Sequence, residues 1–291
     1  MKKFKESELI LNNDGSIYHL HLRPENIAKN IIFVGDPERV PKVSKHFDSI
    51  RFKTNKREFV THTGFIANKE FSVVSTGIGT DNIDIVLTEL DALVNIDLET
   101  RTEKAQKTAL NIIRIGTSGT LVEDVDCDSI LYSEFGLGLD GLMNFYAYKN
   151  SEIEKNILQE INNHIPNLPV APKIAAASNK LMQLFESDNM IKGITATATG
   201  FYGPQGRILR AQPLVTGFVD KLSEKTYNGH RVTNLEMETA AIYGLGNILG
   251  HHCLSVNTIL ANRKTKAFSG NPKKAVENCI LNTLEILSSS L

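Results

Sequence analysis

The side chains most suited to binding an anion lie in short glycine-bearing segments of this chain. Each segment follows an apolar run and carries polar residues beside its glycine; the segments are residues 35–39 (GDPER), 75–80 (STGIGT) and 114–119 (RIGTSG). Glycine-rich backbone N–H groups favour anions, and the planar guanidinium groups of Arg39 and Arg114 match phosphate oxygens. Any one segment alone is more typical of an ordinary strand-to-helix turn. Three in one chain, two of them with an arginine, favour an anion site.

None of these segments matches a named nucleotide-binding motif. The chain contains no G-x-x-x-x-G-K-[ST] sequence. The pair Gly77 and Gly79 is followed by Asn82, where a dinucleotide fingerprint needs its last glycine. The glycine segments therefore indicate an anion without naming the reaction.

Two other patterns could indicate a metal, and neither holds. His251 and His252 are adjacent, so on a strand they would face opposite ways, and no third ligand is evident. The acidic run 124–128 (DVDCD) is similar to a calcium loop, but Ser129 occupies its glycine position and Phe135 its bidentate glutamate position. We expect no metal site.

The composition excludes several classes of partner and compartment. The 32 basic residues against 33 acidic ones leave a net charge of −1 without a basic stripe, so nucleic acid is not an expected partner. The charged start lacks the apolar region of a signal peptide, and no apolar run is long enough to span a bilayer. The three cysteines are far apart and odd in number, which favours a reducing compartment. We expect a cytoplasmic protein without membrane contact.

Extended and helical patterns alternate along the chain. We expect strands at residues 31–34, 58–67, 71–76, 111–115, 130–132, 145–148, 193–199 and 253–260. We expect helices at residues 83–94, 151–161, 178–185, 237–249 and 275–287. A tight hairpin turn is expected at residues 68–69, and segment 114–119 is expected to turn after its strand. The alternation predicts a three-layer α/β/α sandwich, with helices on both faces of a central sheet. The only candidate linker, 162–172, is short, so one domain is expected over residues 1–291.

Five segments, taken in order, resemble the nucleoside phosphorylase superfamily that contains the uridine phosphorylases. They are residues 34–40 (VGDPERV), 75–79 (STGIG), 112–119 (IIRIGTSG), 201–207 (FYGPQGR) and 234–239 (NLEMET). The resemblance spans about residues 17–263. It implies a mixed, twisted central sheet and an enzyme that uses phosphate to cleave a nucleoside.

The resemblance also implies a role for particular residues. Phosphate would be bound by Gly35, Arg39, Arg57, Arg114 and Thr117. The ribose would be bound by His19, Met237 and Glu238, and the base by Phe201, Gln205 and Arg207. His19 and Arg57 would come from a neighbouring subunit, which implies a homo-oligomer. A dimer is the main expectation, and a hexamer is the alternative.

The residue chemistry fits these implied roles. Phosphorolysis builds positive charge on the sugar and negative charge on the leaving base, while phosphate is the nucleophile. Glu238 would hold ribose hydroxyls, Gln205 suits the O4 and N3–H edge of uracil, and Arg207 would stabilise the developing uracil anion. Gln205, Arg207 and Glu238 are therefore the expected catalytic residues, and no cofactor is needed besides inorganic phosphate. Glu236 and Glu238 could also suggest a glycosidase pair, but the arginines favour phosphate as the attacking group.

Other activities of the same superfamily stay open at this point. Its hexameric purine nucleoside phosphorylases carry an aspartate after a late strand, and residues 260–263 here read LANR, which favours a pyrimidine. A nucleosidase would use water, and the arginines argue against it. A non-catalytic nucleoside-binding protein is the third alternative. The sequence does not separate uridine from deoxyuridine or thymidine. The polar segment 96–110 and the acidic segment 121–129 depart from the family pattern, and they bear on which subunit faces are free to assemble.

Overall fold

A strand buried on both faces organises the core. The computed structural model describes residues 3–187 and 190–290. Strand β1 (Asn30–Val34) reads NIIFV, and its last four residues are buried. Ile31 and Phe33 pack into one apolar cluster, whereas Ile32 and Val34 pack into another. Side chains alternate along a strand, so a continuous apolar run is what a strand covered on both sides requires.

The sheet has 11 strands of mixed direction. Its order is β11 (Thr226–Tyr227), β12 (His230–Glu236), β10 (Ile191–Ala198), β8 (Ile130–Leu139), β13 (His252–Asn262), β7 (Asn111–Thr120), β1, β4 (Lys69–Ser75), β3 (Phe59–Ile66) and β2 (Ser49–Lys56), with β9 (Lys173–Ala176) on β8. β1 is parallel to β4 and β7, and β13 is parallel to β7. β13 is antiparallel to β8, and β7 also pairs antiparallel with β12. The strands β7, β12, β10, β8 and β13 therefore form a closed circuit.

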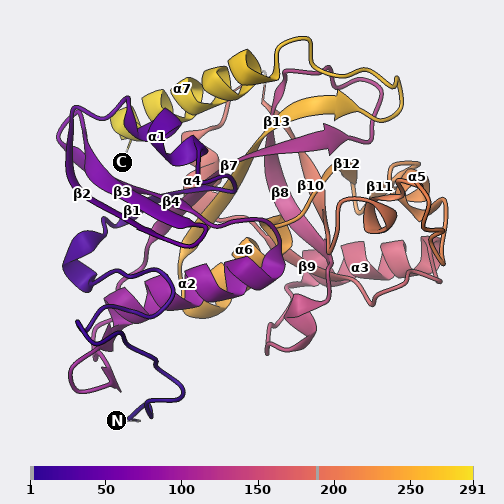
Figure 1. The fold of residues 1–291 in the computed structure, drawn as a ribbon. Coiled ribbons are helices and arrows are strands. Elements are labelled where there is room, and N and C mark those ends of the chain that lie inside the picture. The colour runs from indigo at the N-terminus through magenta and orange to yellow at the C-terminus, as the bar shows by residue number, and fades with distance from the viewer. Residues whose placement is uncertain (1–2, 188–189, 291) are drawn as a thin grey trace.

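Helices cover both faces of the sheet, as Figure 1 shows. Helices α1 (Arg39–Ser44), α4 (Asn179–Leu184) and α7 (Pro272–Ser290) contribute to the cluster that contains Ile32 and Val34. Helices α2 (Thr80–Asn95) and α6 (Thr239–Leu249) contribute to the cluster that contains Ile31 and Phe33. Helices α3 (Glu152–His164) and α5 (Phe218–Leu222) pack with β8, β10 and β12. The expected α/β/α sandwich with a mixed, twisted sheet is confirmed.

Several local expectations were wrong, each for a physical reason. The hairpin between β3 and β4 turns at Ala67 and Asn68, which have φ of 48° and 63°, one residue earlier than expected. Segment 114–119 is not a turn, because β7 continues to Thr120 and pairs with β13 throughout. Residues 145–148 form no strand. β2 and β12 carry polar residues that hid them from the pattern, and β9 is only four residues long. Arg57, directly before the strand expected at residues 58–67, lies in the turn between β2 and β3 with φ of 57°.

The polar segment 96–110 adds a small separate sheet. Strands β5 (Ile96–Asp97) and β6 (Thr102–Glu103) pair antiparallel, and Lys3 bridges to Thr102. The Arg101 guanidinium also donates a hydrogen bond to the carbonyl of Leu9. This segment therefore anchors the N-terminal residues. Within residues 3–187 and 190–290, no helix combines the length and apolar character that a membrane crossing requires.

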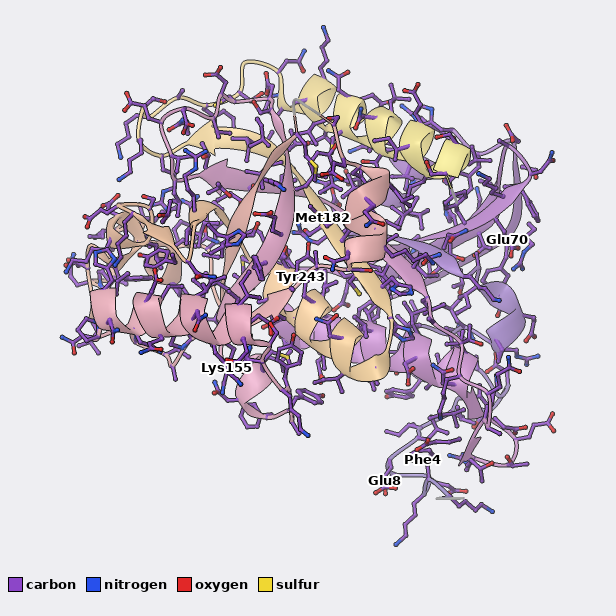
Figure 2. The ribbon with its side chains drawn as sticks, turned by 180° about the vertical axis from the view of Figure 1, so that it is seen from behind. Phe4, Glu8, Glu70, Lys155, Met182 and Tyr243 are labelled. Atoms are coloured by element: carbon purple, nitrogen blue, oxygen red, sulfur yellow. The ribbon has the colours of Figure 1, made fainter. Side chains whose placement is uncertain are left out.

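Tyr243 ties α6 to the sheet, and its position is labelled in Figure 2. Its side chain is fully buried. The phenol donates a hydrogen bond of 2.7 Å to the carbonyl of Ser133 and accepts one of 2.8 Å from the backbone N–H of Ser255. It thereby joins β8 and β13, the two strands beneath the helix.

We expect Tyr243→Phe to lower the free energy of unfolding by about 1–3 kcal/mol, because it leaves two buried backbone groups without their partner. Urea unfolding measures this change. Tyr202→Phe is the matched control, since Tyr202 is 56% exposed and surface substitutions shift stability by at most ~0.5 kcal/mol. Equal losses in the two variants would contradict the role of the buried phenol.

Candidate active site

A cavity of about 770 Å³ opens where several strands end. β1 leads into Gly35 there, β4 leads toward Gly77, and β12 leads into Met237. Ligands of open α/β sheets bind at such an edge, because strand ends and helix starts converge there. Most of the residues expected to bind substrate line this cavity: Gly35, Arg39, Arg114, Thr117, Phe201, Gln205, Arg207, Met237 and Glu238.

Arg114 is the most enclosed cation of the cavity, with 5% of its surface exposed. It lies on β7 two residues before Gly116, so both positions are on the same face of the sheet. A Cβ atom at residue 116 would lie only 1.8 Å from Arg114 Nη1. The guanidinium therefore occupies the space that the missing side chain of Gly116 leaves free.

Two carboxylates accompany this guanidinium. Glu238 accepts a hydrogen bond from Arg114 Nη2, and Glu236 Oε2 lies 3.3 Å from the same nitrogen. Burial opposes the charge of Arg114, but Glu238 and Glu236 raise its pKa above the ordinary value. The buried cation is thus held in its charged form.

Glu236 and Glu238 have different surroundings. Glu236 accepts hydrogen bonds from the backbone N–H groups of Glu238 and Thr239 and from the hydroxyl of Thr197, so it caps the start of α6. Burial raises the pKa of Glu236, although Arg114 opposes that shift. Glu238 instead accepts a 2.7 Å hydrogen bond from the N–H of Gly79, next to the first residue of α2. Glu236 therefore has a structural role, and Glu238 links two walls of the cavity.

Arg39 lies beside Arg114 without a carboxylate of its own. Its Nη1 donates a hydrogen bond of 3.2 Å to the carbonyl of Ile115. Among the described residues, no acidic side chain lies within 4.0 Å of its guanidinium nitrogens. Burial, and then the charge of Arg114, lower the pKa of Arg39. Asp36 and Glu238 oppose this shift from a greater distance. A second, mostly buried cation without a close ion pair is the feature that an anion would stabilise.

The other end of the cavity is built from segment 201–207. Gln205 is buried, and its side-chain oxygen accepts a hydrogen bond from Arg207. The Arg207 guanidinium carbon lies 3.8 Å from the centre of the Phe201 ring, and its Nη1 donates to the carbonyl of Phe201. Burial, and then the charge of Arg263, lower the pKa of Arg207. An aromatic face, an amide and a cation converge here, a set suited to a flat polar ring.

Arg263 is a supporting residue that the sequence reasoning did not assign. Its Nη1 donates a hydrogen bond to the backbone carbonyl of Gln205, which joins the end of β13 to segment 201–207. The sequence signal for it is its place shortly after the strand predicted at residues 253–260. The cavity also has lining residues that lie outside the quoted motifs: Glu58, Asn82, Leu260 and Phe268.

His19 and Arg57 do not line this cavity. His19 Nδ1 lies 2.6 Å from Glu89 Oε1 on α2. Arg57 is exposed in the β2–β3 turn. Lys56, directly before it, donates a hydrogen bond to the carbonyl of Tyr18, directly before His19. The two residues therefore lie in neighbouring segments outside the cavity of their own chain.

The described part of the chain holds no group of three or more His, Cys, Asp or Glu residues placed to bind a metal ion. His251 Nδ1 accepts a hydrogen bond from the N–H of Leu110, and its Nε2 lies 3.3 Å from Asp91. Asp124, from the acidic run, pairs with Arg231. Both features have structural partners.

Comparison with known proteins shows the family to which this chain belongs. The model of the phosphorylase superfamily matches residues 29–289, so the chain belongs to that superfamily. It is 28% identical to the uridine phosphorylase of Thermococcus kodakarensis, an alignment that covers 99% of this chain and 92% of that protein. It is 23% identical to the DeoD-type purine nucleoside phosphorylase of Buchnera aphidicola, with 88% of this chain and 92% of that protein covered.

A solved structure is similar over nearly the whole chain. The nucleoside phosphorylase of Trypanosoma brucei, described as showing uridine phosphorylase activity, is 30% identical with a TM-score of 0.88. The alignment covers 97% of this chain and 100% of that one.

We expect Gly116→Ala to abolish stabilisation of the protein by inorganic phosphate, because the added methyl group would displace the Arg114 guanidinium. Thermal unfolding at increasing phosphate concentration measures this effect. Gly119→Ala on the same strand is the control, since the nearest atom to its Cβ outside the neighbouring residues would be the Ala261 carbonyl oxygen, at 3.6 Å. A wild-type response of Gly116→Ala would remove Arg114 from the anion site.

Proposed function

We propose that this protein cleaves uridine with inorganic phosphate to give uracil and ribose 1-phosphate. One observation carries the proposal: a single cavity holds the unpaired Arg39 beside Arg114 at one end, and Gln205 with Arg207 at the other. The first pair suits phosphate and the second suits uracil. The most similar curated relative cited above is a uridine phosphorylase, and the similar trypanosomal structure is described with that activity.

Phosphate would bind between Arg39 and Arg114. The two guanidinium groups present planar sets of N–H donors to its oxygens, and Gly35 and Thr117 line the same region. The bound dianion is held as the nucleophile, and its charge faces the sugar as positive charge develops there. Removal of water from this buried site would strengthen these interactions.

The ribose would lie over Met237 and Glu238, between phosphate and base. The Glu238 carboxylate can accept hydrogen bonds from sugar hydroxyls, which fixes the distance between phosphate and the reacting carbon. Because Glu238 also bonds Arg114, the sugar site and the phosphate site share one side chain. Binding of each substrate would therefore affect the other.

The uracil ring would stack near Phe201 and meet Gln205 and Arg207. The Gln205 amide offers an acceptor for N3–H and a donor for O4. Arg207 would stabilise the negative charge that the leaving uracil gains as the glycosidic bond breaks. These residues and phosphate supply the chemistry without a further cofactor.

The last residue of β13 favours a pyrimidine over a purine. Asn262 is buried there, and its Nδ2 donates hydrogen bonds of 3.0 Å to the carbonyls of Val122 and Val125. Its Oδ1 accepts from the N–H groups of Lys264 and Thr265. This amide is fully engaged with backbone and offers no acid that could protonate a purine ring.

The proposal is tested by following uracil release from uridine with and without phosphate. We expect release to require phosphate, and ribose 1-phosphate to appear in equal amount. Equal release without phosphate would identify a nucleosidase instead. Faster cleavage of inosine than of uridine would overturn the choice of a pyrimidine.

We also propose that the active form is a homodimer in which His19 and Arg57 complete the neighbour's site. Both residues lie outside the cavity of their own chain, in segments that contact each other through Lys56 and Tyr18. In a two-fold dimer the same surface is used on both subunits, so one pair of segments could serve each cavity. A hexamer would contain the same pairing.

Complementation between two inactive variants tests this arrangement. We expect Arg57→Ala and Arg114→Ala each to abolish activity as homodimers. A mixed dimer would contain one intact site, built from Arg114 of one subunit and Arg57 of the other. After joint refolding, random pairing should restore about a quarter of wild-type activity. An inactive mixture would contradict the shared site.

A further inference from the structure

Directly beneath Arg114 the core is polar where a sheet interior is usually apolar. The fully buried polar residues of this region are Ser133, Thr195, Asn234, Thr239, Ser255 and Asn257. They come from β8, β10, β12, α6 and β13, the strand circuit and the helix on top of it. Buried polar groups need hydrogen-bond partners, and here they form a connected network that contacts Arg114 at one point.

That point is Asn257 on β13. The register between β7 and β13 places Asn257 opposite Gly116, the residue over which the Arg114 side chain lies. Arg114 Nη1 donates a hydrogen bond of 2.9 Å to Asn257 Oδ1. The guanidinium is therefore held from two sides, by the carboxylates of Glu236 and Glu238 and by this neutral amide oxygen.

The rest of the network determines which way the Asn257 amide points. Its Nδ2 donates hydrogen bonds of 3.3 Å to the hydroxyl oxygens of Ser133 and Ser255. Thr239 donates to the same Ser255 oxygen, and the Ser133 hydroxyl is engaged with Thr195. Both hydroxyl oxygens thus face the amide nitrogen, which leaves the amide oxygen toward Arg114.

The network also returns to the cavity. The Thr195 hydroxyl donates a 2.7 Å hydrogen bond to Asn234 Oδ1, and Asn234 Nδ2 donates a 2.9 Å bond to Ser118. Ser118 lines the same cavity as Arg114. The buried polar network is therefore connected to the cavity through Ser118 as well as through Arg114, and it is not an isolated cluster.

We propose that Asn257 is a positioning residue that holds Arg114 in place for phosphate without neutralising its charge. The inference rests on the proposed phosphorolysis, in which Glu238 turns its carboxylate toward the ribose hydroxyls. Arg114 then loses part of its interaction with the Glu238 carboxylate. It needs a second hydrogen-bond acceptor whose position does not change when substrate binds. A neutral amide keeps the guanidinium oriented and leaves its positive charge available to the phosphate dianion, whereas a carboxylate in that place would compete with phosphate.

The test compares Asn257→Asp and Asn257→Leu with Thr258→Val. Aspartate keeps the shape and the acceptor but adds a negative charge, and leucine keeps the size but removes the acceptor. Thr258 is the matched control, since the next residue on a strand faces the opposite side of the sheet. Initial rates are measured over a range of phosphate at saturating uridine, and over a range of uridine at saturating phosphate.

We expect Asn257→Asp to raise the KM for phosphate by ~10-fold or more, equivalent to about 1.4 kcal/mol, while kcat and the KM for uridine change less than ~3-fold. Asn257→Leu should also raise the KM for phosphate, because the guanidinium loses its fixed acceptor. Thr258→Val should behave like the wild type. A merely structural role would alter stability without singling out phosphate, so thermal unfolding is recorded for each variant.

The outcomes separate this inference from the proposed function. A wild-type enzyme that releases uracil equally well without phosphate would overturn both. A phosphate-dependent wild type together with an unchanged phosphate KM in Asn257→Asp would overturn the role of Asn257 alone. Since Asn257→Asp preserves the shape and the acceptor toward Arg114, and loses only the two 3.3 Å hydrogen bonds donated by Nδ2, it carries the test even where Asn257→Leu fails to fold.

Discussion

The structure of the site depends on one buried guanidinium. A charge in the interior is costly unless it is paired and hydrogen-bonded, and Arg114 satisfies both conditions through Glu238, Glu236 and Asn257. Each partner comes from a segment distant in the chain. The need to satisfy this cation therefore joins β7, β12 and β13 at the point where the cavity opens, and the absence of a side chain at Gly116 provides the space.

The same requirement explains the chemistry of the neighbouring groups. Glu236 is occupied with the start of α6, so Glu238 is the carboxylate of this pair that can exchange partners. Arg39 adds a second cation without adding a carboxylate. Two guanidinium groups thus lie close together at one end of the cavity. Two adjacent sets of planar N–H donors suit a small dianion, whereas a chain with a net charge of −1 has no general attraction for large polyanions.

Much of this arrangement could be predicted from the sequence. The apolar run of β1 and the glycines after it indicated the sheet edge, and short motifs pointed to Arg39, Arg114, Gln205 and Arg207, which line one cavity. Asn257 and Arg263 could not be found in that way, because their roles depend on strand register and on a side chain that reaches a backbone carbonyl. β12 was hidden because its polar residues face a polar core. The proposed contribution of His19 and Arg57 to a neighbouring site depends on packing between chains, which a single sequence does not encode in a local pattern.

The central position of β13 has a consequence for how the protein acquires activity. This strand is the last one in the chain, yet it pairs with both β7 and β8 in the middle of the sheet. Its contacts with β7 join residues about 140 positions apart, and such long-range pairing slows folding. The site therefore forms only after β13 has been made and has paired with β7 and β8. Chains that lack this strand carry the earlier motifs without a formed cavity.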